Sequence, residues 1–192
     1  YDIIIEAGRS ELHYWKDLWR YRELFFFLSW KELLVRYKQT VMGVMWSVIR
    51  PVLTMIVFTV VFGKIAKLPS SGVPYPILVF CAMLPWQYFA NSFSEASVSL
   101  IANTNLVSKI YFPRIIIPSS TIMMSLVDLM ISILVLAAIM AWYSFIPTWK
   151  AFLLPLFLLL DIILSLGAGF IVSALNVKYR DFKHVVPFII QF

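Results

Sequence analysis

The sequence predicts an all-α, polytopic membrane protein with an amphipathic helix near its N-terminus. Hydrophobic residues make up 61% of the 192 positions and charged residues only 14%, and the mean hydropathy is +0.87. This composition is typical of membrane proteins. The cations are also segregated, because eight of the sixteen Lys and Arg residues lie in residues 1–50. Segregation of this kind indicates topology rather than nucleic-acid binding, which needs a soluble basic face, so no nucleic acid is expected as a partner.

Residues 1–46 are expected to form a cytoplasmic segment that precedes a transmembrane domain over residues 47–192. Within this segment, residues 18–40 alternate apolar and basic side chains. At about 100° per residue the alternation gives an aromatic-rich apolar face and a basic face, as in a helix lying at the membrane interface. Such a helix anchors the chain, packs on a cytoplasmic partner, or does both. The residues assigned to this interface helix are Arg20, Arg22, Phe25, Leu28, Lys31 and Arg36.

The first two spans are predicted over about 47–66 and 77–102. Pro51 suits an early position in the first helix, where its missing N–H leaves no hydrogen bond unmade. The second run is apolar only to about Ala90 and continues as the polar stretch "NSFSEASVSLIA", which contains Glu95. Polar side chains are unfavourable against lipid, so this half is expected to face protein or water, or to leave the bilayer.

Two further spans are predicted over about 115–142 and 151–177, interrupted only by Asp128 and Asp161 respectively. A fifth begins near residue 185 and is unfinished at residue 192, so the chain is expected to be a fragment of a longer protein. In the fourth span, small residues recur every four positions at Ser165, Gly169 and Ser173. That spacing predicts a seam for close helix packing.

The distribution of cations over the loops predicts the orientation. The N-terminal region up to and including Arg50, together with the loops over 103–114 and 176–184, holds thirteen Lys and Arg residues, whereas the other loops hold three. Positively charged loops stay on the cytoplasmic side, so these three regions and the N-terminus are expected in the cytoplasm. The protein is accordingly expected to be a multi-pass protein of the cytoplasmic (inner) membrane.

No motif for soluble-enzyme chemistry is present. Gly63 and Lys64 are followed by Ile65 and lack the upstream glycine of a phosphate-binding loop, so the chain is not expected to bind ATP itself. His13 and His184 lie far apart and lack metal-ligand spacing. We therefore expect no catalytic residues, no metal and no cofactor on this chain, and no enzymatic activity.

Three acids, Glu95, Asp128 and Asp161, fall inside predicted spans. A carboxylate in the bilayer is costly unless it is paired, protonated or hydrated. The acids could act as relays in a proton-coupled secondary transporter, or serve in interhelical hydrogen bonds and a polar lining, which is the reading that we favour. Asp128 is the strongest functional candidate because it lies about midway in its span.

Aromatic residues make up 17% of the chain and gather near predicted span ends. An interfacial belt explains this placement, and composition favours that explanation. The alternative is stacking on sugar rings, whose C–H faces suit flat π surfaces. The aromatics concerned are Trp86, Tyr88, Phe89, Trp142, Tyr143 and Trp149.

Four stretches, in order, carry a family resemblance: "RYKQTVMGVMWSVIRPVLTMIVFTVVF", "PYPILVFCAMLPWQYFANSF", "NTNLVSKIYFPRIIIP" and "NVKYRDFKHVVPF". Together they resemble the permease subunits of ABC exporters for cell-surface polysaccharides, the class that moves O-antigen, capsule or teichoic acid chains. The resemblance implies a permease of six spans in full length, of which four spans and the start of a fifth are present here. It also implies a dimer with a second copy and two ATP-binding cassette subunits, which hold the ATP and Mg.

The resemblance further implies that lipid-linked polysaccharide passes between the two permease copies, within the membrane lipids, along a partly aromatic lining. The candidate lining residues are Trp46, Phe58, Phe62, Trp86, Tyr88, Phe89, Glu95 and Asp128. The polar island "NTNLVSKIYFPR" corresponds to a short coupling helix between spans two and three. Its residues assigned to coupling with the ATPase are Asn103, Thr104, Asn105, Leu106, Val107, Ser108, Lys109, Pro113 and Arg114. Lys109 and Arg114 could instead enforce topology or hold lipid phosphates.

Two other function classes are separable from this hypothesis by experiment. A proton-coupled carrier would transport in response to a pH gradient without any ATPase. A membrane-embedded glycosyl- or acyltransferase needs a catalytic acid or His at a membrane face, and the sequence supplies no convincing constellation.

Overall fold

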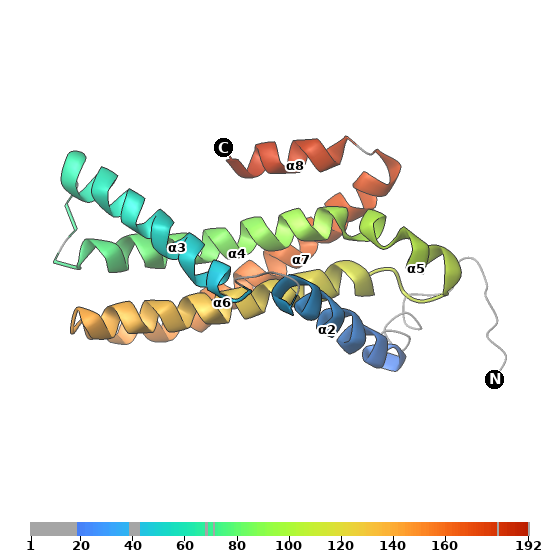
Figure 1. Ribbon diagram of the computed structural model, residues 1–192, viewed down its shortest axis with the longest axis horizontal. Coiled ribbons are helices and arrows are strands. Elements are labelled where there is room, and N and C mark those ends of the chain that lie inside the picture. Colours follow the sequence, from blue (N-terminus) through green and yellow to red (C-terminus); the bar gives the residue numbers. More distant parts are fainter. Residues whose placement is uncertain (1–18, 39–42, 68, 71, 180, 192) are drawn as a thin grey trace.

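The computed structural model describes residues 19–38, 43–67, 69–70, 72–179 and 181–191, and the regular elements within these ranges are all helical (Figure 1). The predicted all-α class is confirmed. Residues 1–18, which include His13, residues 39–42, and residues 68, 71, 180 and 192 lie outside the described residues. The helices are α2 (Arg22–Lys38), α3 (Met45–Phe58), η1 (Thr59–Ile65), α4 (Tyr75–Ala102), α5 (Thr104–Lys109), α6 (Ile116–Trp142), η2 (Trp149–Leu153), α7 (Leu154–Lys178) and α8 (Phe182–Gln191).

Three helices in the described ranges are long and apolar enough to cross a membrane: Met45–Ile65, Ile116–Trp142 and Ala151–Lys178. They coincide with the first, third and fourth spans expected from the sequence. The first comprises α3 and its continuation η1, a π-helical stretch of seven residues.

Helix α4 covers the expected second span and, at 28 residues, is the longest helix of the described ranges. Its polar half is buried against protein, with Ser92, Ser97 and Ser99 almost inaccessible. Their hydroxyls donate to backbone carbonyls of the preceding turn, which satisfies them within the helix. Of the alternatives open from the sequence, burial against protein is the one observed.

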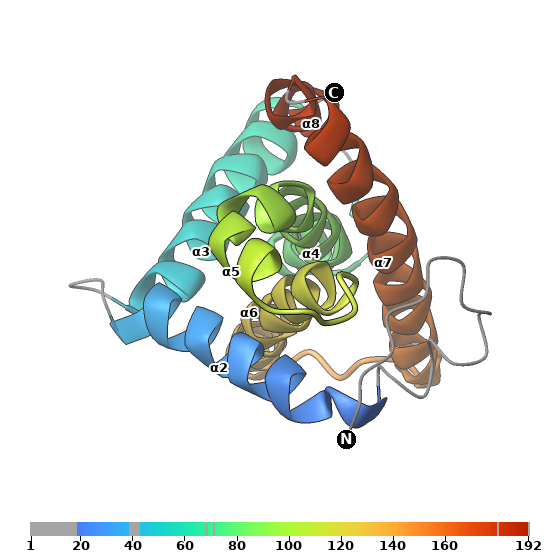
Figure 2. The ribbon, with the colours of Figure 1, turned by 90° about the vertical axis from the view of Figure 1, so that its right-hand side faces the viewer.

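The position of α4 in the bundle explains this burial. Seen end-on, α4 lies in the middle with α6 beside it, while α2, α3, α7 and α8 surround the pair (Figure 2). Its most extensive contacts are with α6 and α7. The main core cluster runs along α4 and α6, and its buried members are Ile77, Phe80, Leu84, Tyr88, Ala96, Ile122, Leu129 and Leu136.

Helix α7 packs on α4 through the predicted small-residue seam, which is confirmed. Ser165, Gly169 and Ser173 are all buried. A Cβ atom added at Gly169 would lie 3.0 Å from the Cβ atom of Ala96, so the two helix backbones approach closely at this point. The opposite face of α7 exposes large apolar side chains such as Phe157 and Ile171, as expected of a surface in contact with lipid.

Helix α2 lies obliquely at the end of the bundle that carries α5 (Figure 1). Leu28, its buried residue, packs in a second core cluster with Phe112, Ile116 and Ile117 at the start of α6. Phe25 is partly buried in the same cluster. Only part of the predicted apolar face is therefore buried in the bundle. The other large apolar side chains of the segment are exposed, namely Trp19, Phe26, Phe27 and Trp30.

Candidate functional site

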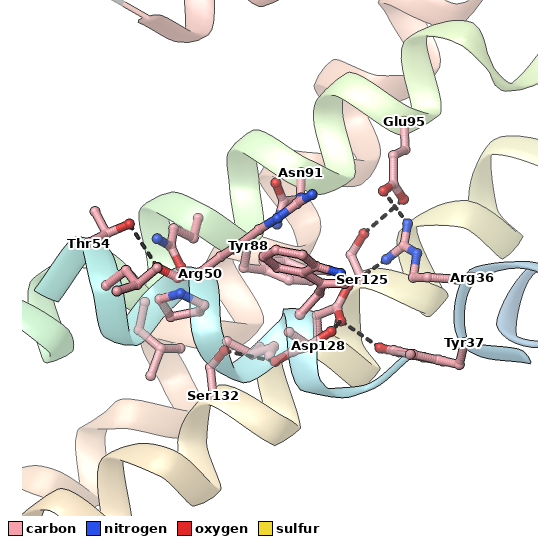
Figure 3. Close-up of a pocket in the computed structure, with 18 residues that line it drawn as sticks. Arg36, Tyr37, Arg50, Thr54, Tyr88, Asn91, Glu95, Ser125, Asp128 and Ser132 are labelled. Carbon is pink, nitrogen blue, oxygen red and sulfur yellow. Dashed lines mark hydrogen bonds and ion pairs between the residues drawn. The ribbon is translucent and has the colours of Figure 1, made fainter. Parts of the chain in front are cut away.

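Four helices meet at a polar cluster centred on Arg36. Its guanidinium, on α2, donates from Nη1 to Oδ2 of Asp128 on α6 at 2.5 Å. Through Nη2 it also pairs with Oε1 of Glu95 on α4. Figure 3 shows the guanidinium between these two carboxylates. Charge-assisted hydrogen bonds of this kind are about twice as strong as neutral ones, so Arg36 ties α2 to both α4 and α6.

Asp128 accepts two further hydrogen bonds at its other oxygen. The Tyr37 hydroxyl donates to Oδ1 at 2.5 Å and the Ser47 hydroxyl, at the start of α3, donates to the same atom at 2.7 Å. The acid in mid-span is therefore paired and hydrogen-bonded, which offsets the cost of removing it from water. Ser125, one turn before Asp128 on α6, completes the cluster at 3.5 Å from Glu95.

Ser47 reaches this cluster from the start of α3, just after Gly43. Gly43 has a φ of +41°, in the left-handed region where a side chain is strained. Glycine therefore suits the position from which the chain enters α3 at Met45. Ser47 then lies in the first turn of the helix, facing Asp128.

The cluster changes the acidity of the two groups that lie on α2. Burial favours the neutral form of Arg36, but hydrogen bonds and charges from Glu95 and Asp128 outweigh it and raise the pKa of the guanidinium above its ordinary value. Burial, with the hydrogen bond to Asp128, raises the pKa of Tyr37 to about 12. Arg36 thus stays a cation and Tyr37 a neutral donor at physiological pH.

The cluster forms one end of a pocket of about 680 Å³ between α2, α3, α4 and α6 (Figure 3). Of the residues predicted to line a channel, Trp46, Tyr88, Glu95 and Asp128 line this pocket. The polar pocket residues that were not among the predicted site residues are Tyr37, Ser47, Arg50, Thr54, Gln87, Asn91, Ser125 and Ser132. A mid-span acid requires hydrogen-bonding partners, which predicts that such partners exist but not that they are Tyr37 and Ser47.

The remaining candidate lining residues lie elsewhere. Phe58 and Phe62 stack on each other at 5.6 Å between ring centroids and are exposed on α3 and η1. Trp86 is exposed on α4 and its ring lies 6.2 Å from that of Phe89. Their role in a channel between two copies stays a prediction.

The three acids of the predicted spans do not come together. Glu95 and Asp128 share Arg36, whereas Asp161 lies on α7, in contact with neither carboxylate among the interactions of the described residues. The contact of Glu95 and Asp128 with one guanidinium agrees with the hypothesis that acids of the predicted spans serve in interhelical hydrogen bonds. The relay hypothesis remains open to test.

The predicted coupling segment folds as the six-residue helix α5 and an extended exit to α6. Thr104, Asn105, Ser108 and Lys109 are exposed, and Arg114 is exposed after the buried Pro113. Leu106 and Val107 pack toward Leu28 of α2. Asn103 accepts a hydrogen bond from the Lys31 ammonium at 3.3 Å, so α5 also contacts the interface helix through a polar pair.

Of the other residues assigned to the interface helix, Arg20, Arg22 and Lys31 are exposed. Arg36 differs from them: the sequence grouped it with the basic face, but in the structure it points into the bundle. Its pairing with acids from two other helices is the reason for that difference.

Comparison with known proteins gives a consistent result. The model of a family described as "ABC-2 type transporter" matches residues 23–192. A Myxococcus xanthus protein named "O-antigen export system permease protein RfbA" is 28% identical over 172 residues, which cover 89% of this chain and 65% of that protein. Two Klebsiella pneumoniae proteins of the same name are each 31% identical, over 81% of this chain and 60% of their own length. The chain therefore spans less than two thirds of the length of these curated relatives.

Proposed function

The chain belongs to the ABC-2 type transporter family, and from this membership we propose that it is the permease subunit of an ATP-driven exporter of lipid-linked cell-surface polysaccharide. The substrate class comprises O-antigen, capsule and teichoic acid chains. The similarity to permeases named for O-antigen export, over most of this chain, supports O-antigen within that class. Transport runs outward across the cytoplasmic membrane, with the N-terminus in the cytoplasm.

The partners are a second copy of the permease and two ATP-binding cassette subunits, which hold ATP and Mg and carry out the hydrolysis. A permease without a nucleotide site receives work only through contacts that differ between the states of its partner. The exposed side of α5 supplies such a contact, because Asn105, Ser108 and Lys109 are directed away from the bundle.

The observation that carries the coupling mechanism is the position of Arg36 between Glu95 and Asp128. Helix α5 joins the ends of α4 and α6, and Arg36 joins these same two helices to α2. A displacement of α5 by the ATPase therefore acts on α4 and α6 together, and the shared guanidinium passes it to α2 and the pocket. Packed helices that shift between discrete arrangements transmit motion in this way.

Reconstitution of the full-length permease with its ATP-binding subunits tests the proposal. The double variant Asn105→Ala, Lys109→Ala removes two exposed side chains from α5 and leaves the Asn103 contact with α2 intact. We expect this variant to insert and assemble normally but to lose ATP-dependent export of lipid-linked glycan into proteoliposomes. Lys183→Ala, on the exposed face of α8, is the matched control and keeps transport.

Two results would argue against this function. Unchanged export by the assembled double variant removes α5 from the coupling path. Transport that follows a pH gradient in the absence of ATP-binding subunits, and is abolished by Asp128→Asn, supports the proton-coupled alternative instead.

A further inference from the structure

The pocket between α2, α3, α4 and α6 has two chemically different ends. One end is the acidic cluster, where Arg36 is shared by two carboxylates. Arg50 lies at the other end (Figure 3), with its guanidinium over the Trp46 ring, and Gln87 and Asn91 of α4 line the same pocket. We propose that this second end binds the phosphate group of an amphiphile's headgroup, with Arg50 as the anion-binding residue. Two sources of phosphate are considered below, the lipid-linked glycan and membrane phospholipid. The first of them rests on the proposed function.

Two cations line the pocket, Arg36 and Arg50. Among the described residues, the acids form ion pairs with Arg36 and none forms an ion pair with Arg50. Its guanidinium lies 5.7 Å from the centroid of the Trp46 ring, one helical turn earlier on α3. Contact with an aromatic face orients a guanidinium without using its N–H donors, which lie in the plane of the group. Arg50 therefore presents unneutralised charge and available donors to the pocket.

The facing helix adds neutral donors. Gln87 and Asn91 lie four residues apart on α4, so their side chains share one face, and both line the pocket. In Figure 3 the Arg50 side chain extends toward Asn91. Each amide carries two N–H donors. A planar guanidinium that binds two oxygens, supplemented by amide donors, suits the geometry and charge of a phosphate group.

The depth of the site matches a lipid phosphate. Arg50 lies five residues after the first residue of α3, Met45, which corresponds to about 7.5 Å along the helix axis. The polar headgroup layer on each side of the hydrocarbon core is on the order of 5–8 Å thick. For a helix that enters the headgroup layer at its first residue, a guanidinium at this level would lie close to the boundary where the phosphates of one leaflet meet the acyl chains. The pocket volume of about 680 Å³ accommodates a headgroup.

The acidic end determines the orientation of the ligand. Glu95 follows Asn91 by one turn on α4, and Asp128 accepts hydrogen bonds from Arg36, Tyr37 and Ser47. One cation shared by two carboxylates leaves a formal excess of negative charge, which repels a phosphate from that end. The anion is thus confined to Arg50, and any uncharged sugar that it carries is directed toward the acceptors of the cluster.

Binding is measured on the full-length permease assembled with its ATP-binding subunits, without ATP. A polyoxyethylene detergent is used because it contains neither phosphate nor sugar. Native mass spectrometry titrates polyprenyl phosphate, with the neutral polyprenol as control probe. Arg50→Gln removes the charge, Arg50→Lys keeps it, and Lys64→Gln removes the same charge from the other end of the same span, where Lys64 is exposed.

We expect wild type to bind polyprenyl phosphate at least about tenfold more tightly than polyprenol, and R50Q to lose about tenfold or more of that affinity, the effect of one charged hydrogen-bonding group. R50K keeps the charge but loses the contact of a planar group with two oxygens, so its affinity should lie between those of R50Q and wild type, and K64Q should keep the wild-type affinity. Equal binding by R50Q and K64Q, or equal affinity for the two probes, would overturn the site. If R50Q does not assemble, Asn91→Ala is titrated instead, and unchanged affinity of that variant likewise overturns it.

Competition by phosphatidylglycerol distinguishes the two sources of phosphate. Displacement of polyprenyl phosphate by equimolar phosphatidylglycerol assigns the site to membrane phospholipid, and resistance to excess phosphatidylglycerol assigns it to the lipid-linked glycan. Both results support a phosphate site at Arg50. The binding measurement contains no ATP and is independent of the export assay. A failure of ATP-dependent export would therefore refute the proposed function but not the phosphate site.

Discussion

Asn176 on α7 donates a hydrogen bond from Nδ2 to the backbone carbonyl oxygen of Ser97 on α4 at 2.8 Å, although the two residues are 79 positions apart in the chain. Asn176 is fully buried. The bond joins the C-terminal parts of α4 and α7, two helices that approach closely at Gly169 and Ala96. A polar side chain thus fixes the register of α7 along α4.

Replacement of this amide should weaken the contact between α4 and α7. Hydrogen bonds between membrane helices contribute on average about 0.6 kcal/mol and at most about 1.7 kcal/mol, so Asn176→Ala is expected to lower the free energy of unfolding within that range. Thermal unfolding in detergent measures the effect. Asn105→Ala, on the exposed side of α5, is the control, and an equal loss in both variants would contradict a specific role for Asn176.

The two glycines of α7 provide a matched pair of substitutions. A Cβ at Gly169 would meet the Ala96 Cβ at 3.0 Å and the Ile122 Cδ1 at 3.2 Å, whereas a Cβ at Gly167 meets nothing within 4 Å. Gly169→Val should therefore destabilise the protein by about 1–3 kcal/mol through overpacking. Gly167→Val, on the exposed side of the same helix, should change the unfolding midpoint little. A reversed order of the two midpoints would refute the close packing of α7 on α4.

Loss of the Arg36 charge should destabilise the four-helix junction. Arg36→Gln leaves Glu95 and Asp128 without their cation, and since all three side chains are partly exposed we expect a loss of about 1–3 kcal/mol, below that for a fully buried pair. Lys38→Gln, two residues later and exposed, is the control. The triple variant Arg36→Gln, Glu95→Gln, Asp128→Asn should recover part of the stability measured by unfolding. Failure to recover any would indicate that the charges act independently.

The Tyr37 hydroxyl makes the free energy of unfolding vary with pH in the alkaline range. Its pKa of about 12 in the folded protein exceeds the ordinary tyrosine value of 10.0, so the unfolded chain loses this proton first as the pH rises. The stability that Tyr37 contributes is fully present below pH 10 and is lost as the pH rises from 10 through 12. The difference in unfolding midpoint between wild type and Tyr37→Phe should therefore shrink over this window. A constant difference between pH 8 and 12 would show that the hydroxyl is not protected in the fold.

The helices were predictable from the sequence because hydropathy and spacing act locally. Long apolar runs identified α3, α6 and α7, and the four-residue recurrence of Ser165, Gly169 and Ser173 identified the side of α7 that packs on α4. Polar residues after Ala90 showed that this half of α4 is unsuited to lipid. They could not show what covers it, because the covering helices are distant in sequence.

The site was only partly predictable. Asp128 stood out as a mid-span acid, but nothing in the sequence spacing links it to Arg36, 92 positions away. Arg36 is one of several cations on an amphipathic helix, and periodicity alone cannot separate the one that turns inward. Arg50 was counted only as a topological charge, because its environment depends on α4, which faces it across the pocket.

The central place of α4 also bears on how the protein is made. Its neighbours α3, α6 and α7 are apolar enough to enter a bilayer individually, whereas α4 does not meet that criterion within the described residues. Its serines are sheltered by other helices rather than by its own apolar character. Since α4 is synthesised after α3 but before α6 and α7, its stable residence in the membrane depends on helices that emerge later. We therefore expect membrane insertion to be cooperative, with α4 stable in the bilayer only once α6 and α7 pack against it.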